Sequence, residues 1–110
     1  NKLQLISCFC INANLYIETK VPPVALFLKH NCQMVLGTDS YSSNWQLSIA
    51  KEMQSLLQHT SLTQEQILQM ATGKGAAALQ WGDALGSFEK SKKPGVVLVK
   101  DDFTSSRRII

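Results

Sequence analysis

The sequence has few charged residues and no long apolar run. Charged side chains make up 17% of its 110 residues, which is below the roughly one quarter usual in soluble domains. No apolar stretch reaches the ~20 residues that a membrane-spanning helix needs, so we expect no membrane span. Aromatic residues amount to only 7%, with three prolines and six glycines, which excludes collagen-like and low-complexity chains. The shortage of charge indicates faces that are covered by other parts of a protein.

Cysteine is also scarce, and its spacing excludes two common structural roles. Cys8, Cys10 and Cys32 leave one thiol unpaired after any disulfide and lack the spacing of a zinc ribbon. Residues two apart in one strand seldom form a relaxed disulfide. Free thiols in a reducing compartment are therefore predicted, with the cytoplasm as location.

Residues 1–6 have no signal-peptide pattern, and because the chain lacks an initiator methionine, we expect it to begin inside a longer protein.

The positive charge is small and dispersed. The net charge is +3, and the basic residues are scattered apart from residues 90–93 and the pair Arg107–Arg108. A nucleic-acid-binding domain usually concentrates its basic side chains in one stripe. We therefore expect no nucleic-acid partner.

The first third of the chain has the pattern of a strand, a helix and a second strand. Residues 3–10 form a nearly continuous apolar run, typical of a strand buried on both faces of a parallel sheet. After a polar turn at residues 12–14, Pro22 and Pro23 can open a helix. Residues 33–37 are predicted to form a second buried strand. This order predicts a parallel βαβ unit and an α/β fold.

Two helix starts are predicted further along the chain. Ser43 and Gln46 fit one capping box, and Thr63 and Gln66 fit another. The first helix has an apolar stripe that leaves Glu52 outside it; the stripe consists of Trp45, Ile49, Met53, Leu56 and Leu57.

The last part of the chain is rich in turns. Gly73 and Gly75 weaken the second helix, and residues 76–79 are expected to form a separate helical piece. Residues 96–99 are strongly β-prone, and such a strand needs partners from elsewhere.

Asp39 is the candidate site residue that the pattern favours. It directly follows the second predicted strand, and α/β folds carry their chemistry at the carboxyl ends of parallel strands. The segment 37–40 also fits an ordinary turn in which the aspartate accepts hydrogen bonds from nearby backbone N–H groups. The residues alone leave both readings open. His30 and His59 fall near predicted helix ends, without metal-ligand spacing, and suit capping roles.

Several short motifs occur in an order that extends over nearly the whole chain. They are Asn12–Ile17, Pro22–Pro23, Val35–Ser40, Ser43–Asn44, Met70–Thr72, Gly75–Ala76, Leu79, Gly86–Ser87 and Lys92–Pro94. Together they resemble the carboxy-terminal portion of the metal-dependent amidohydrolase superfamily. The similar branch includes chlorohydrolases and the guanine, cytosine and S-adenosylhomocysteine deaminases.

The resemblance implies a (β/α)8 barrel with a small β-sandwich. Residues 1–81 would be the last part of the barrel, with its seventh and eighth strands at 3–10 and 33–37. Residues 82–110 would be a strand segment of the sandwich. The family's metal-binding aspartate closes the eighth strand, at the position of Asp39 here.

The resemblance also implies an activity. Asp39 would bind a divalent metal, zinc or alternatively iron, and take the proton of the hydrolytic water. Asn12 and Asn14 would contact the substrate, a small cyclic molecule whose non-peptide C–N or C–Cl bond is cleaved.

The other metal ligands of the family have no counterpart in this sequence. A catalytic zinc generally needs three protein ligands, so we expect the 110-residue chain to be inactive alone and to self-associate through exposed strand edges and apolar faces. The alternative is a free-standing small α/β module for binding or oligomerisation, without catalysis.

Overall fold

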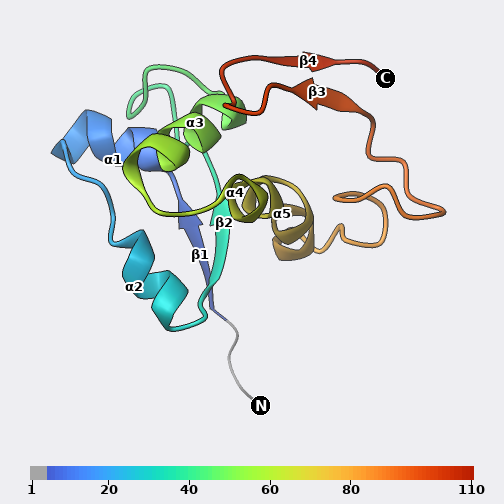
Figure 1. Cartoon of the computed structure of the whole chain (residues 1–110), viewed down its shortest axis with the longest axis horizontal. Coiled ribbons are helices and arrows are strands. Elements are labelled where there is room, and N and C mark those ends of the chain that lie inside the picture. Colours follow the sequence, from blue (N-terminus) through green and yellow to red (C-terminus); the bar gives the residue numbers. More distant parts are fainter. Residues whose placement is uncertain (1–4) are drawn as a thin grey trace.

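The computed structural model describes residues 5–110 (Figure 1). Residues 3 and 4, the start of the first predicted strand, lie outside this range. The elements follow one another along the chain as β1 (Ile6–Phe9), α1 (Ile11–Glu18), α2 (Val24–Lys29), β2 (Gln33–Leu36), α3 (Ile49–His59), α4 (Gln64–Ala71), α5 (Gly73–Ala78), β3 (Val97–Val99) and β4 (Ser106–Arg108).

β1 and β2 form a parallel pair at the centre of the molecule. Ile6 lies opposite Gln33, and Phe9 opposite Leu36. The chain crosses from one strand to the other through α1 and α2 (Figure 1). The predicted parallel βαβ unit is thereby confirmed. Because both strands run in one direction, the chain segments that follow them emerge at the same edge of the sheet.

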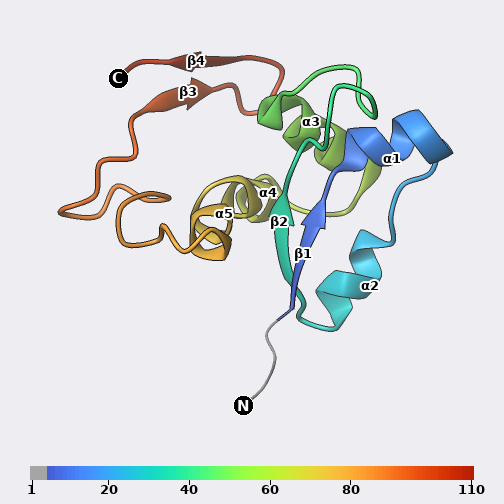
Figure 2. The same ribbon diagram turned by 180° about the vertical axis from the view of Figure 1, so that it is seen from behind.

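The two faces of this strand pair have different surroundings. From behind, β1 and β2 lie in front of α3 and α4 (Figure 2), which therefore pack on the far face. Phe9 is buried with its ring on Phe27 of α2, whereas Ile6 and Cys8 alternate to the other face of β1 and are exposed. In β2, the consecutive residues Met34 and Val35 are both buried. Among the described residues, the expected burial of both faces is therefore met in β2 and not in β1.

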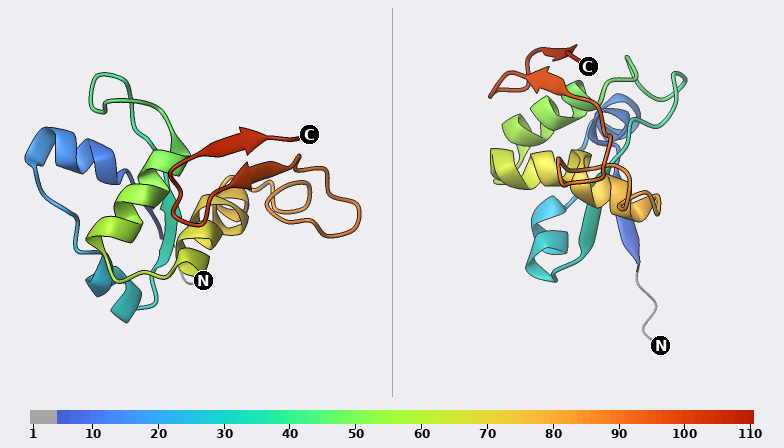
Figure 3. Two further views of the ribbon diagram at one scale, coloured as in Figure 1. Left: turned by 45° about the horizontal axis from the view of Figure 1, so that its top comes forward. Right: turned by 90° about the vertical axis from the view of Figure 1, so that its right-hand side faces the viewer.

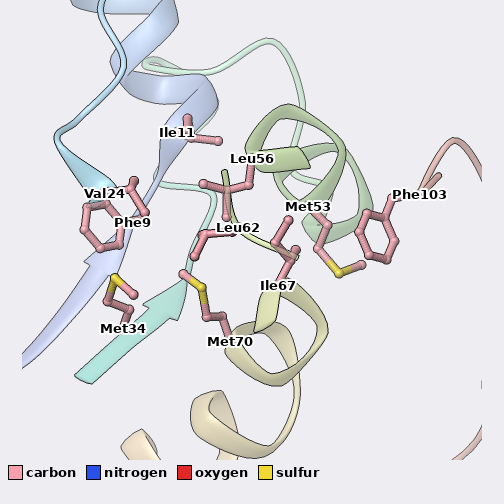
Figure 4. Packing of buried hydrophobic residues seen from close by; sticks show 10 residues of the cluster. All are labelled: Phe9, Ile11, Val24, Met34, Met53, Leu56, Leu62, Ile67, Met70 and Phe103. Carbon is pink, nitrogen blue, oxygen red and sulfur yellow. The ribbon is translucent and has the colours of Figure 1, made fainter. Parts of the chain in front are cut away.

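The core lies between the strand pair and the helices α3 and α4 (Figure 4). Leu56 of α3 and Ile67 of α4 are fully buried. Met70 reaches toward the strands, and Phe103, from the turn between β3 and β4, packs beside Met53 (Figure 4). The carboxy-terminal segment is thus anchored on the helices by an aromatic side chain.

The two predicted helix starts have different outcomes. Thr63 and Gln66 form a complete capping box at α4, as predicted. The start predicted at Ser43 is wrong, because α3 begins at Ile49 with Ser48 as its N-cap. The Ser43 hydroxyl is instead held by the carbonyl of Ser40, at 3.2 Å. The same hydroxyl accepts the backbone N–H of Ser40, also at 3.2 Å, so it serves its own turn and not the start of a helix.

Trp45 was expected in the core and lies outside it. Since α3 starts later than predicted, Trp45 belongs to the preceding loop and is 59% exposed. It packs edge-to-face on Tyr16 of α1, with ring centroids 5.1 Å apart. The helical spacing that grouped it with Ile49 therefore does not apply to it.

The last strands form a hairpin that projects to one side of the molecule (Figure 3). β3 pairs antiparallel with β4, and Val97 lies opposite Arg108. The partner of the β-prone segment thus comes from the chain's own last residues. In the hairpin turn, the Asp102 carboxylate accepts hydrogen bonds from the hydroxyl and the backbone N–H of Thr104, and these lower the pKa of Asp102.

Among residues 5–110, no helix has the length and apolar content to cross a membrane.

Candidate functional site

Asp39 lies just beyond the carboxyl end of β2 and is exposed. Its backbone has a left-handed conformation, with φ of 59°, which aspartate tolerates better than most residues. The residue borders a pocket of about 250 Å³. The pocket is lined by Asp39, by Cys8 and Cys10 on the β1 side, and by four α1 residues that include Asn14 and Glu18. The chain segments after both parallel strands therefore meet at Asp39.

Gly37 allows the two cysteine side chains to lie across the strand pair. A Cβ atom at this position would come within 2.8 Å of the Cys8 sulfur and 3.2 Å of the Cys10 sulfur, closer than normal contact. Burial, followed by the neighbouring Cys8, raises the pKa of Cys10 to about 11. The Cys10 thiol is therefore protonated at neutral pH and is a poor nucleophile.

The described part of the chain supplies one predicted metal ligand rather than a set. Between residues 5 and 110, no three His, Cys, Asp or Glu side chains gather closely enough to hold a metal ion. Asp39 itself suits such a role, because its exposed carboxylate oxygens are donors that zinc and iron accept. His59 lies at the end of α3, with its Nδ1 2.9 Å from the carbonyl oxygen of Ser55, and has the expected place at a helix end.

The two predicted substrate-binding asparagines lie in the first turns of α1, where a turn had been expected. Asn14 is half-buried and lines the pocket beside Asp39. Asn12 is buried and faces α3, and its Oδ1 accepts a hydrogen bond of 2.6 Å from the Ser55 hydroxyl. The structure thus brings Asn14 to the pocket and places Asn12 behind it.

Behind the pocket lies a fully buried carboxylate, Glu52 of α3. One of its oxygens accepts a hydrogen bond from the backbone N–H of Asn12, at 3.0 Å. The other accepts one from the side-chain amide of Asn44, at 2.8 Å. Burial raises the pKa of Glu52, and the hydrogen bonds from Asn12 and Asn44 oppose that rise.

Sequence reasoning missed Glu52 and placed it on the polar side of its helix. A signal for its burial was present, because Glu52 follows Ile49 by three residues and precedes Leu56 by four. Residues at these spacings share a helix face. The apolar stripe of α3 is defined by hydrophobic residues alone, so it does not include the Glu52 carboxylate on the same face.

Comparison with known proteins gives consistent matches over most of the chain. A model of the amidohydrolase family matches residues 2–108. A 5-methylthioadenosine/S-adenosylhomocysteine deaminase from Caldanaerobacter subterraneus subsp. tengcongensis is 32% identical over 95 residues, covering 79% of this chain and 22% of the relative. An S-triazine hydrolase from Gordonia rubripertincta is 29% identical over 93 residues, covering 77% and 20%.

A solved structure also resembles this fold. The crystal structure of an adenosine deaminase from Xanthomonas campestris with bound zinc has a TM-score of 0.72 and 26% identity. The match covers 91% of this chain and 24% of that one. The chain spans about a fifth of the length of the curated relatives it matches.

Proposed function

Because the chain belongs to the amidohydrolase family, we propose that the protein carrying it is a metal-dependent hydrolase that deaminates a small cyclic substrate. The observation that carries this proposal is the position of Asp39, at the carboxyl end of a parallel strand and on a pocket. Relatives named as deaminases of 5-methylthioadenosine, S-adenosylhomocysteine and 5'-deoxyadenosine support a C–N bond as the target. Cleavage of a C–Cl bond is the less supported alternative.

In this proposal β1 and β2 are the seventh and eighth strands of a (β/α)8 barrel. Their parallel pairing supports it, as does the exposed face that carries Ile6 and Cys8. Further barrel strands would cover that face and the open strand edges. Residues 1–81 would belong to the barrel, and residues 82–110 to a small β-sandwich that includes the β3–β4 hairpin.

Asp39 would hold the metal together with ligands from other parts of the protein. The metal would be zinc, as in the structural relative, with iron as the alternative. A bound zinc ion lowers the pKa of a water molecule to near neutrality. A carboxylate oxygen of Asp39 takes a proton from the attacking water and passes it to the leaving nitrogen. A C–O bond forms, the C–N bond breaks and ammonia leaves. Asn14 lies on the pocket wall and would orient the substrate. Asn12, which is buried behind that wall, would support substrate binding from there.

The activity is tested by measuring ammonia release from the whole protein. With zinc bound, we expect turnover of at least one of 5-methylthioadenosine, S-adenosylhomocysteine and 5'-deoxyadenosine. Removing the metal with a chelator should abolish turnover, because the water then returns to its ordinary pKa, and adding zinc back should restore it. Persistent turnover in metal-free protein would contradict the mechanism. Release of chloride or alkylamine from a substituted triazine, without ammonia from the nucleosides, would favour an activity like that of the S-triazine hydrolase relative.

The 110-residue chain alone is expected to self-associate and to show no hydrolysis. Leu5 is 75% exposed and Ile6 47%, and strand edges with exposed apolar side chains pair with other copies. Sedimentation velocity should therefore show species heavier than 12.2 kDa. A monomer that unfolds cooperatively would contradict this expectation and favour the free-standing binding module.

We propose a cytoplasmic location and a small-molecule rather than nucleic-acid partner. The cysteines Cys8, Cys10 and Cys32 are free thiols, which supports a reducing compartment. The dispersed basic residues support the absence of a nucleic-acid surface.

A further inference from the structure

We propose that Glu52 is a positioning residue, whose buried carboxylate ties together the segments that follow β1 and β2 and thereby holds Asp39 in place. This inference rests on the proposed function, because it assigns Glu52 a part in the work of Asp39. The two residues do not need to touch: Glu52 acts through Asn12 on one side and Asn44 on the other.

The first connection runs from α3 to the end of β1. Oε2 of Glu52 accepts the backbone N–H of Asn12, 3.0 Å away and 40 residues earlier in the sequence. This N–H belongs to the first turn of α1, where no earlier helical carbonyl is available to accept it. The Ser55 hydroxyl, one helical turn after Glu52, adds a 2.6 Å hydrogen bond to Oδ1 of the same asparagine. Asn12 is therefore held at both its backbone and its side chain.

The second connection runs from α3 to the segment that carries Asp39. Oε1 of Glu52 accepts a hydrogen bond from Nδ2 of Asn44, at 2.8 Å. The same amide nitrogen donates to the carbonyl oxygen of Thr38, also at 2.8 Å. An amide nitrogen has two protons, and both are used here. Asn44 thus relays the position of Glu52 to the peptide bond between Thr38 and Asp39.

That peptide bond is where a fixed geometry matters. Asp39 has a left-handed backbone, with φ of 59°, a conformation that persists when the surroundings enforce it. Thr38, immediately before it, is half-buried and is held through its carbonyl oxygen. Displacing a catalytic carboxylate by about 1 Å lowers the reaction rate strongly. Holding the Thr38 carbonyl in place therefore keeps the Asp39 carboxylate in its working position.

The chemistry of the cluster requires an ionised acid. Each oxygen of Glu52 faces a donor, and an ionised carboxylate accepts on both oxygens, whereas an amide would turn its own N–H groups toward one donor. Glu52 is fully buried, and keeping a carboxylate there is costly. Burial raises the pKa of Glu52, in keeping with that cost. A leucine at this position would complete the apolar face of α3, so the acid has a role other than packing.

The test compares four variants of the whole zinc-bound protein: Glu52→Gln, Glu52→Asp and two controls. Glu52→Gln keeps the size of the side chain but leaves one of the two donors without an acceptor. Glu65→Gln makes the same chemical change at an exposed position of α4. Ile67→Ala removes fully buried apolar contacts and touches none of these hydrogen bonds, and so controls for a loss of stability alone.

We expect Glu52→Gln to lower kcat about 10- to 100-fold, as for other residues that orient a ligand. KM should stay within about threefold, because Glu52 itself does not line the pocket. Hydrogen exchange should accelerate in the segments 10–14 and 37–45. Glu52→Asp, which keeps the charge on a shorter side chain, should recover part of kcat. The control variants Glu65→Gln and Ile67→Ala should keep the kcat of the wild-type protein. Unchanged kcat in Glu52→Gln, or an equal loss in Ile67→Ala, would overturn the proposal.

The two proposals can fail separately. If the wild-type protein turns over none of the substrates, the proposed deamination is wrong, and zinc affinity then decides the role of Glu52. Weaker zinc binding in Glu52→Gln than in Ile67→Ala would support it, and equal affinities would overturn it.

Discussion

Replacing Asp39 with asparagine is expected to reduce kcat of the whole protein by about a thousandfold, within the usual range for a residue that transfers protons. Asparagine has nearly the same size, so the pocket and the backbone at φ 59° should be preserved. Its amide cannot take a proton from water at neutral pH, and it is a weaker metal ligand than a carboxylate. The loss should therefore appear in kcat and in bound zinc, measured by steady-state kinetics and by metal analysis of the purified protein.

A matched control is available on the same molecule. Asp83→Asn makes the same change at an exposed aspartate in the turn region after α5, and we expect it to leave kcat and zinc content unchanged. If Asp39→Asn retained the activity of the zinc-loaded wild-type protein, Asp39 would be an ordinary turn residue. The family resemblance would then have misplaced the catalytic carboxylate.

Truncating Leu56 to alanine is expected to lower the free energy of unfolding by about 2–5 kcal/mol. Leu56 is fully buried in the apolar cluster of the core (Figure 4), so its loss removes apolar contacts and leaves a cavity. Alanine is the better helix former, so the loss can be attributed to packing rather than to the helix itself. Urea unfolding of the whole protein, followed by a probe in this segment, measures the shift in midpoint.

Gln58→Ala serves as the control for this prediction, because Gln58 lies on the exposed side of the same helix. We expect its effect to stay within about 0.5 kcal/mol. Equal stability of the Leu56 and Gln58 variants would mean that α3 does not pack on the strands as the structure has it.

Local sequence patterns were sufficient where an element is determined by its own residues. The apolar runs predicted β1 and β2, and the prolines predicted the start of α2. Thr63 and Gln66 predicted the cap of α4, since both halves of a capping box lie within four residues. The family resemblance pointed to Asp39, which the structure places at the end of β2 and on a pocket. Its role as a metal ligand stays a prediction.

Patterns failed where a side chain had a choice of partners. Ser43 has the sequence spacing of a cap, but the carbonyl of Ser40 holds its hydroxyl and Ser48 caps α3 instead. Trp45 has helical spacing to Ile49, yet it pairs with Tyr16, which is distant in the sequence. In each case the partner is decided by how the chain folds around the side chain, which local spacing does not show.

By itself, the sequence determined the strands β1 and β2, the start of α2, the cap of α4 and the position of one acid at a strand end, because periodicity, caps and motifs are local properties of the chain. It did not predict α1, because a turn was expected at residues 12–14. The tertiary structure alone decided that Glu52 is buried and that it joins Asn12 to Asn44. The residues of that cluster are up to 40 positions apart. A carboxylate can be kept in a protein interior only when folding brings donors to it, and no local pattern shows which donors will arrive.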